Sequence, residues 1–289
     1  MNENPSFTVI TKNIDGYTVT ISKPTDENIL GITFLLPGSN IAVEEYNSHR
    51  DVLISENQIV LSFYINVLWP LSDNHRTKAK AVKKVFDIFY SKYAPKSIPE
   101  KYSIVGHSVG GKIALLVPTL YDHDRVMNVI ALDPVDQSPS EFTNSSTQSD
   151  ISLQSLLFPI ILTLTDGGNG ISKDHDAHAI HEKNLTNTVL IRHEGAGHMA
   201  YTDHGGGYLG DLVPKGTPEG DKAGWEGAHD LIRKYVGGKD QVFHVHEGIL
   251  TENVDFVSTS NKRFWFILVG IILVLFQMTM YSYAVLKLN

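Results

Sequence analysis

The sequence predicts an α/β protein, in which a mostly parallel β-sheet carries helices on both faces, followed by one transmembrane helix. Short apolar runs alternate with amphipathic segments over about 230 residues, which is the pattern of such a sheet. A run of 23 uncharged residues at 264–286 predicts the membrane span. We therefore expect a catalytic domain at residues 1–238, a polar connector at 239–263 and the transmembrane helix at 264–286.

The elements follow one another along the chain in a regular order. An antiparallel hairpin is expected first, from strands at 7–12 and 17–22 that meet at the turn Asp15-Gly16. Further strands are expected at 29–36, 58–66, 102–105, 126–132, 158–165 and 188–192, and most are nearly continuous apolar runs, as in strands buried on both faces. Helices are expected at 43–54, 75–94, 110–120, 174–183 and 221–236, and a loop with a short helix at 137–155.

Composition excludes several classes of function. The net charge is -8 and no basic patch stands out in the first 260 residues, so nucleic acid is not an expected partner. The chain has no cysteine, which excludes disulfides, thiolate metal sites and a cysteine nucleophile.

The strongest motif is Gly106-His107-Ser108-Val109-Gly110-Gly111, between an expected strand and an expected helix. This is the Gly-x-Ser-x-Gly pattern of a nucleophile elbow, in which a sharp turn leaves no room for side chains beside the serine. The turn should project Ser108 at the helix N-terminus, where the positive end of the helix dipole favours a developing anion. We predict that Ser108 is a nucleophile.

A serine nucleophile needs a base, and the usual chain order in this type of site is serine, acid, histidine. The segment His193-Glu194-Gly195-Ala196-Gly197-His198 follows the last expected strand, and its glycines would let the chain bend back over Ser108. His198 is therefore the predicted base. His204 is the second choice, and His193, still at the strand end, is expected to be structural.

Two carboxylates are candidates for the acid of the site. Asp133 follows the strand at 126–132, and Asp166 follows the strand at 158–165. Both strands should lie close to the Ser108 strand, so spacing alone leaves the two open. Asp136 is a weaker third candidate and is expected to be a turn residue.

An oxyanion hole requires two backbone N–H groups beside the nucleophile. One is expected from Val109, the residue after the serine, and the other from the loop after the strand at 29–36. In that loop we select Ser39, with Asn40 as the alternative. The chemistry needs no cofactor.

The segment 174–182 is rich in metal-ligand types and contains His178 and Glu182 at helical i,i+4 spacing. A solvated helix start with acidic residues is the preferred interpretation. No metal site is predicted there.

Three motifs together, GHSVGG, ALDPVD and GAGHMAYTD, resemble those of the chlorophyllases, which are α/β-hydrolases. Platelet-activating-factor acetylhydrolases and polyester-degrading cutinases are more distantly similar, and the likeness spans roughly residues 29–236. The resemblance implies an α/β-hydrolase fold, with Ser108 as nucleophile, His198 as base and Asp133 as acid. The polyester hydrolases use the following strand, which would favour Asp166. Val109 stands where chlorophyllases carry arginine, and the cysteines of the plant enzymes are absent, which puts a chlorophyll substrate in doubt.

These features predict a serine ester hydrolase that acts on a lipid-like or hydrophobic ester. Thioester hydrolysis or acyl transfer at the same site is an alternative, and a non-catalytic, membrane-anchored binding protein is another. Lys262 and Arg263 precede the apolar run and Lys287 follows it, so the lipid bilayer is an expected partner. With no signal peptide recognisable at the start, we expect a tail-anchored protein whose catalytic domain is cytosolic.

Overall fold

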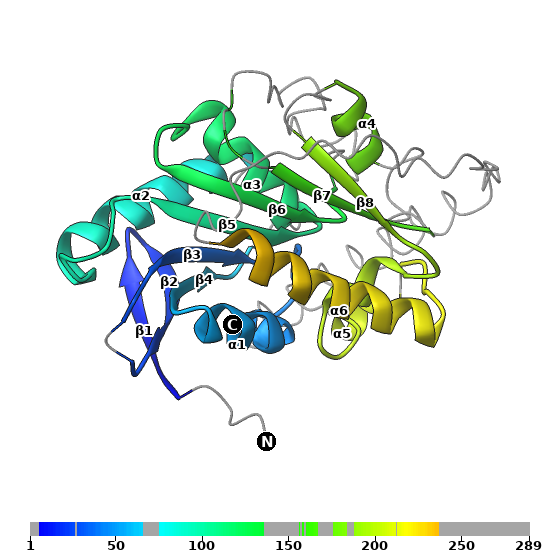
Figure 1. The fold of residues 1–289 in the computed structure, drawn as a ribbon, viewed down its shortest axis with the longest axis horizontal. Helices are drawn as coiled ribbons and strands as arrows, with labels where there is room; N and C mark the ends of the chain where they lie inside the picture. Colours follow the sequence, from blue (N-terminus) through cyan, green and yellow to red (C-terminus); the bar gives the residue numbers. More distant parts are fainter. Residues whose placement is uncertain are drawn as a thin grey trace, which may run out of the picture. The chain divides into compact units, whose positions relative to one another are not determined.

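The computed structural model describes residues 6–26, 28–65, 75–135, 156, 158, 160–166, 176–183, 188–211 and 213–236 (Figure 1). All of them fall in one compact unit, Met1–Val245. Among these residues, no helix is both long enough and apolar enough to cross a membrane. The predicted connector at 239–263, the predicted span at 264–286 and the expected loop at 137–155 lie outside the described residues.

Eight strands form a single sheet in the order β1-β2-β4-β3-β5-β6-β7-β8. They are β1 (Phe7–Ile14), β2 (Tyr17–Pro24), β3 (Gly31–Leu36), β4 (Gln58–Phe63), β5 (Tyr102–His107), β6 (Val126–Leu132), β7 (Ile160–Thr165) and β8 (Thr188–His193). The hairpin β1–β2 is antiparallel, β2 runs antiparallel to β4, and the pairs from β4 to β8 are parallel. The expected hairpin and the mostly parallel sheet are thus confirmed.

The helices follow the expected order with two differences. They are the 3-10 turn η1 (Val43–Tyr46), α1 (Asn47–Ser55), α2 (His75–Tyr93), α3 (Val109–Leu120), α4 (Asp176–Lys183), the 3-10 turn η3 (His198–Tyr201), α5 (Gly207–Gly210) and α6 (Pro218–Tyr235). The single helix expected at 43–54 was wrong in its first turn, which is a 3-10 turn that leads into α1. The turn η3 and the short helix α5 were not expected.

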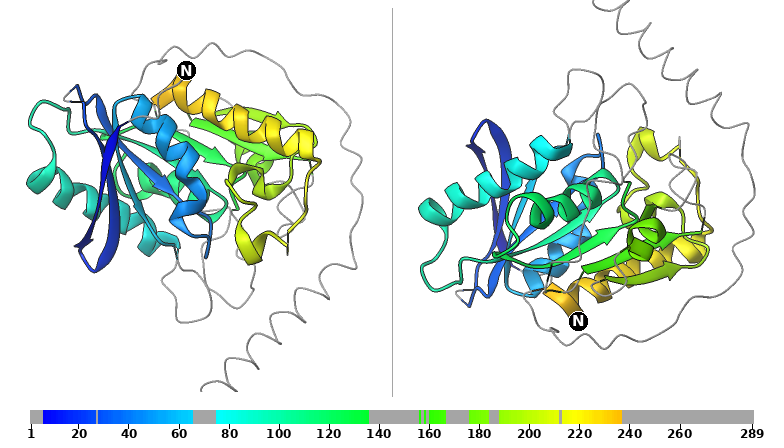
Figure 2. Two further views of the ribbon diagram at one scale, coloured as in Figure 1. Left: turned by 90° about the horizontal axis from the view of Figure 1, so that it is seen from below. Right: turned by 90° about the horizontal axis from the view of Figure 1, so that it is seen from above.

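Helices cover both faces of the sheet, as Figure 2 shows, with α1 and α6 on one face and α2 and α3 on the other. Each face carries its own buried cluster, because successive strand residues point to opposite sides. In β3, for example, Phe34 belongs to the cluster under α2 and α3, whereas Leu35 belongs to the cluster under α1 and α6. Burial on both faces explains why β3 to β7 consist largely of apolar residues.

The parallel register brings together the residues that follow β3, β5 and β6. Leu36 pairs with Gly106, and His107 pairs with Leu132, so β3, β5 and β6 end side by side. The residues that follow these strands therefore meet at one edge of the sheet, where ligands bind in open α/β sheets.

Candidate active site

Ser108 lies in a sharp turn between β5 and α3, with φ 57° and ψ -125°. Non-glycine residues rarely adopt this conformation, and it persists only where the surroundings enforce it. A Cβ added to Gly106 would lie 2.3 Å from the carbonyl oxygen of Gly110. A Cβ added to Gly110 would lie 2.4 Å from the carbonyl oxygens of Leu36 and Pro37. The two glycines are therefore required by close backbone approach.

The three residues predicted from the motifs lie together. His198 Nε2 is 3.0 Å from Ser108 Oγ, and His198 Nδ1 is 2.5 Å from Asp133 Oδ2. The carboxylate accepts the Nδ1 proton, which leaves Nε2 able to accept the serine proton. Only 5% of Ser108 is exposed, and His198 and Asp133 are also buried. Burial strengthens the electrostatic interactions among the three side chains.

Residues of the neighbouring strand β7 hold Asp133 in place. Asp133 has φ 41°, its N–H donates to Thr163 Oγ1 at 3.0 Å, and Thr165 Oγ1 donates to its Oδ2 at 3.0 Å. The Thr165 hydroxyl and the histidine thus share one carboxylate oxygen, which fixes the direction in which the carboxylate points.

The other two candidate acids lie elsewhere. Asp166 accepts hydrogen bonds from Arg192 Nε and from the Gly195 N–H, each at 2.5 Å. Its carboxylate therefore anchors the start of the His198 loop, and no bond joins it to the His198 ring. Asp136 lies outside the described residues. Of the two alternatives that spacing left open, the structure brings Asp133 to His198.

The loop that carries His198 bends at two glycines. Gly195 has φ 71°, and a Cβ on Gly197 would lie 2.2 Å from the backbone nitrogen of Gly216. The Gly197 N–H donates to Asp221 Oδ1 at 2.7 Å, at the start of α6. These contacts direct the turn η3, and with it the His198 ring, back over the end of β5.

The remaining candidate histidines have other surroundings. His204 is exposed and its N–H donates to Glu45 Oε2 at 3.1 Å. His193 Nδ1 lies 2.8 Å from the hydroxyl of Tyr201. Burial lowers the pKa of His193 and raises that of Tyr201, which favours a neutral ring beside a protonated hydroxyl. His193 is expected to be structural, and this contact with Tyr201 is of a structural kind.

The predicted oxyanion loop follows β3. Gly38 packs against Ser108, since a Cβ added there would lie 3.2 Å from Ser108 Cβ. The Gly38 N–H donates to Tyr46 Oη at 2.9 Å, and the Asn40 N–H donates to the Ile65 carbonyl at 3.0 Å. No described residue accepts a hydrogen bond from the N–H of Ser39 or Val109. The N–H of the alternative, Asn40, is thus engaged, whereas the two selected N–H groups have no acceptor in the described part of the chain.

The metal-ligand types of the 174–182 segment do not gather in the described part of the chain. Asp174 and His175 lie outside it, and His178 Nδ1 is 3.8 Å from Glu182 Oε1 within α4. His181 Nδ1 instead contacts Thr188 Oγ1 at 2.6 Å. The residues that the structure describes hold no group of three or more histidine, aspartate or glutamate side chains suited to a metal ion.

Sequence reasoning missed two residues that support this site, Tyr46 and Asp203. Tyr46 Oη lies 2.7 Å from His107 Nδ1, and the Asp203 carboxylate binds the backbone N–H of Ser48 at 2.9 Å. The partners are 61 and 155 residues apart in the chain, so no local pattern could indicate either contact.

One known family model matches part of the chain. Residues 41–158 match the family model of the PGAP1-like alpha/beta domain, which is a family of the α/β-hydrolase type. The matched stretch is less than half of the chain; it contains Ser108 and Asp133 and ends before His198. No curated protein matches the sequence significantly. The match and the sheet topology together support an α/β-hydrolase-type fold, with hydrolase chemistry in general as its usual activity.

Proposed function

We propose that this protein is a serine hydrolase that cleaves carboxylic esters through Ser108, His198 and Asp133. The observation that supports it best is the continuous buried chain from Asp133 Oδ2 through the His198 ring to Ser108 Oγ, with steps of 2.5 and 3.0 Å. An inert serine would not need an elbow at φ 57°, since strain of this kind is retained at functional sites.

In the proposed acylation step, Ser108 Oγ attacks the ester carbonyl carbon while His198 Nε2 takes the hydroxyl proton. The Asp133 carboxylate stabilises the imidazolium that forms. The carbonyl oxygen becomes an oxyanion, which the N–H groups of Ser39 and Val109 stabilise. Collapse of the tetrahedral intermediate breaks the ester C–O bond, and His198 Nε2 returns its proton to the leaving alcohol.

Water then attacks the acyl-enzyme, again with His198 as base. The bond between the acyl carbon and Ser108 Oγ breaks, His198 Nε2 returns its proton to Ser108 Oγ, and the carboxylic acid product leaves. A thioester would form the same acyl-enzyme, and an acceptor alcohol in place of water would give acyl transfer. These reactions share every step at Ser108, so the same residues support them. They differ in the leaving group or in the acceptor of the acyl group.

The proposed substrate is a lipid-like or hydrophobic ester. Two features of the sequence support it: the resemblance of the GHSVGG, ALDPVD and GAGHMAYTD segments to chlorophyllases, and the apolar run at 264–286. A helix of 23 residues is about 34 Å long, against about 30 Å of bilayer hydrocarbon. The proposal therefore includes attachment to a membrane, where hydrophobic esters are concentrated.

A fluorophosphonate probe tests the chemistry, because it reacts with activated serine nucleophiles far faster than with ordinary serines. The full-length protein in mild detergent should become labelled at Ser108 and should hydrolyse p-nitrophenyl esters. Ser108→Ala should lose both, with a rate loss on the order of 10⁴ to 10⁶. Ser91→Ala, at an exposed serine on α2, is the matched control and should keep both. An unlabelled parent, or Ser108→Ala activity within tenfold of the parent, would contradict the proposal.

Alkaline carbonate extraction tests the membrane attachment. Protein with a spanning helix should stay in the membrane pellet, and a variant that lacks residues 262–289 should move to the supernatant. Release of the full-length protein by carbonate would rule out the span.

A further inference from the structure

We infer that Tyr46 and His107 are positioning residues, which hold the oxyanion loop and the His198 turn in register with the nucleophile elbow. This inference rests on the proposed function. It is carried by a buried chain of hydrogen bonds that joins three segments remote from one another in the sequence.

This chain of hydrogen bonds starts in the loop after β3, where the Gly38 N–H donates to Tyr46 Oη at 2.9 Å. Tyr46 Oη lies 2.7 Å from His107 Nδ1. On the other side of the ring, His107 Nε2 lies 2.9 Å from the carbonyl oxygen of His198. His107 immediately precedes Ser108, so the chain links the oxyanion loop, the elbow and the base.

The direction of every proton in this chain follows from its ends. The His198 carbonyl can only accept, so His107 Nε2 must carry the proton and Nδ1 must accept. The Tyr46 hydroxyl therefore donates to Nδ1, and its oxygen accepts the Gly38 N–H. Burial holds the pKa of His107 well below its usual range and raises that of Tyr46, which keeps the ring neutral and the hydroxyl protonated.

The chain leaves its members little freedom to move. Tyr46 and His107 are each only 1% exposed, and the rings of His107 and His198 lie 4.8 Å apart, centroid to centroid. A buried polar group that loses its partner is costly, so the Gly38 and His198 backbones are held where these bonds can form. Gly38 precedes Ser39, and the His198 carbonyl belongs to the base itself. A shift at either end would displace a group that acts on the substrate.

Two substitutions separate the two ends of the chain, in the full-length protein assayed in detergent with a p-nitrophenyl ester. Tyr46→Phe removes the acceptor of the Gly38 N–H and should lower kcat by roughly tenfold to a hundredfold, with KM within about threefold of the parent. The loss should be larger for an oxygen ester than for the corresponding thionoester, whose sulfur accepts hydrogen bonds weakly. This difference reports on the oxyanion hole, which a general loss of structure would not reveal.

His107→Leu removes the donor to the His198 carbonyl and should lower kcat while it shifts the acidic limb of the pH–rate profile. His107→Gln keeps one donor and one acceptor at the end of the side chain, and should restore kcat to within about threefold of the parent. Tyr90→Phe is the matched control, because it removes a hydroxyl in α2 that donates to the Ile98 carbonyl at 3.0 Å, outside this chain of hydrogen bonds. It should leave kcat unchanged.

Thermal unfolding shows which variants are folded, and if Tyr46→Phe is not, the two His107 variants decide. A labelled, active parent whose kcat is unchanged in Tyr46→Phe and His107→Leu would overturn this inference and leave the proposed function standing. Equal losses in His107→Leu and His107→Gln would also overturn it. A parent that neither reacts with the probe nor hydrolyses esters would overturn the proposed function, and the inference with it.

Discussion

Ser108 and Asp133 both have positive φ values, 57° and 41° respectively, and both directly follow a strand of the parallel sheet. Strain at two adjacent strand ends costs stability that packing elsewhere must offset. The hydrogen bonds of each residue account for how it is held. The Ser108 N–H donates to the Leu132 carbonyl at 3.0 Å, and the Val135 N–H donates to the Ser108 carbonyl at 3.0 Å. The turn at Ser108 and the turn at Asp133 are therefore bonded directly to each other.

The two candidate acids give a prediction at the residue scale. Asp133→Asn should lower kcat by about 10⁴, because an amide cannot hold the His198 ring in the required tautomer or stabilise its cation. Asp166→Asn should lower it by less than about tenfold, since this carboxylate binds Arg192 and the Gly195 N–H. Steady-state kinetics on a p-nitrophenyl ester decides, and the opposite ranking would assign the acid to β7.

Ser108 and His198 could be predicted because each lies in a short motif next to an element boundary. Position alone left Asp133 and Asp166 open, since both follow strands in the right part of the sheet, and only the resemblance to the chlorophyllases favoured Asp133. The hydrogen bonds that join Asp133 to Thr163 and Thr165 of β7 link residues 30 or more positions apart in the chain, and no local pattern indicates them.

At the scale of elements, α1 is capped from outside the helix. Tyr46, at the N-cap position, makes no side-chain capping bond, and the Asp203 carboxylate accepts the Ser48 N–H at 2.9 Å instead. Trp225 Nε1, on α6, donates to the same carboxylate at 3.3 Å, and the Asp203 N–H donates to the Glu45 carbonyl at 2.8 Å. Asp203, which follows η3, thus joins the His198 turn to α1 and α6.

Asp203→Ala should lower the free energy of unfolding by about 1 kcal/mol, because it leaves the α1 N-terminus without its cap. It should also lower kcat, since the His198 turn loses its contact with α1. Urea unfolding and steady-state kinetics measure the two effects. Asp211→Ala is the control, because that exposed carboxylate pairs only with exposed Lys215 among the described residues. Equal effects of the two substitutions would contradict the capping role.

The stabilisation that Asp203 gives to α1 depends on pH. Burial alone would raise the pKa of Asp203, but the hydrogen bonds from Ser48 and Trp225 and the nearby His49 together outweigh burial and hold the pKa below its ordinary value. A carboxylate with a lowered folded-state pKa stabilises the fold above its unfolded pKa. That contribution is lost as the pH falls through the folded pKa.

Helix and strand positions were largely predictable because apolar periodicity reflects burial on the two faces of the sheet. The division of this segment into η1 and α1 was not predictable from the sequence. It depends on the Asp203 carboxylate, which comes from 155 residues away to meet the Ser48 N–H. The turn η3 likewise depends on contacts of Gly197 with Gly216 and Asp221.

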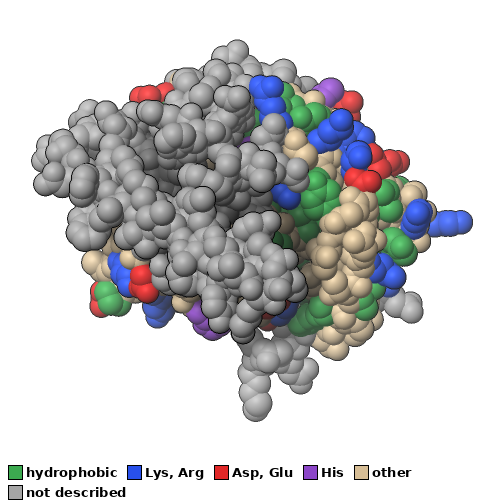
Figure 3. Space-filling view, turned by 180° about the vertical axis from the view of Figure 1, so that it is seen from behind, with side chains coloured by type: hydrophobic (Ala, Val, Ile, Leu, Met, Phe, Trp, Pro, Cys, Tyr) green, Lys and Arg blue, Asp and Glu red, His purple; other side chains and the backbone are tan. Residues whose placement is uncertain are grey.

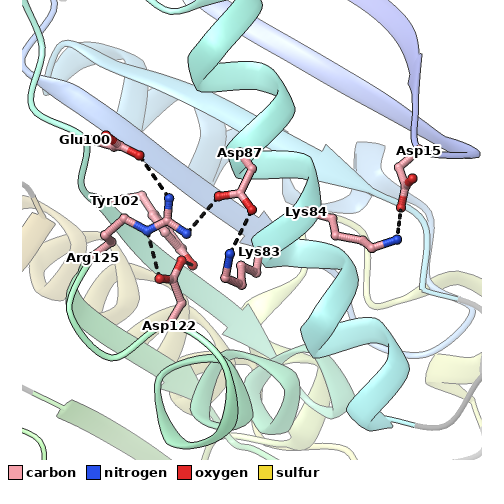
Figure 4. A network of polar contacts seen from close by, with 8 residues as sticks. All are labelled: Asp15, Lys83, Lys84, Asp87, Glu100, Tyr102, Asp122 and Arg125. Atoms are coloured by element: carbon pink, nitrogen blue, oxygen red, sulfur yellow. Dashed lines mark hydrogen bonds and ion pairs between the residues drawn. The ribbon is translucent and has the colours of Figure 1, made fainter.

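At the scale of the whole molecule, the described charged side chains form mixed groups at the surface and one partly buried network. Seen from behind, the described surface carries basic and acidic side chains close together (Figure 3). A network of ion pairs surrounds the partly buried Arg125. Its guanidinium contacts Asp122 at 2.8 Å, Asp87 at 2.8 Å and Glu100 at 3.1 Å (Figure 4). Tyr102 Oη also donates to Asp122 at 2.8 Å. The network ties α2 to the start of β5 and to the segment before β6.

Arg125→Met should destabilise the protein by about 2 to 3 kcal/mol, because it leaves the nearly buried Asp122 without its cation. Lys84→Met is the matched control: it breaks a more exposed pair with Asp15 and should cost less than about 1 kcal/mol. Urea unfolding of the full-length protein in detergent compares the two. A cost for Arg125→Met no larger than that of Lys84→Met would contradict the structural role of the network.

Buried histidines predict acid sensitivity of the whole fold. Burial lowers the pKa of His49 and of His75 to about 3, from an ordinary value of about 6.5. Between these values the unfolded chain binds protons that the folded chain does not, so stability is complete above about pH 6.5 and falls as the pH decreases. Each of the two rings should contribute a slope of about 1.4 kcal/mol per pH unit.

Urea unfolding at pH 7, 6 and 5 measures this slope. His49 is packed against His229 of α6 and lies near Asp203, and burial is the main cause of its lowered pKa. His49→Phe should therefore reduce the slope by about one proton, whereas substitution of the exposed His123 by Gln should leave it unchanged. A slope that His49→Phe leaves intact would show that this ring does not couple protonation to unfolding.

The contacts of Asp133 and Asp166 have a consequence for how a site with the proposed triad could diverge. Both carboxylates end neighbouring parallel strands, and both bind the same short loop, one at the His198 ring and the other at the Gly195 N–H. A lineage could therefore transfer the acid from β6 to β7 while the base and the nucleophile keep their places. Only the few residues between Gly195 and His198 would need to re-aim the imidazole. The sheet thus offers two neighbouring sources of the same carboxylate, and a change of strand need not mark a separate origin.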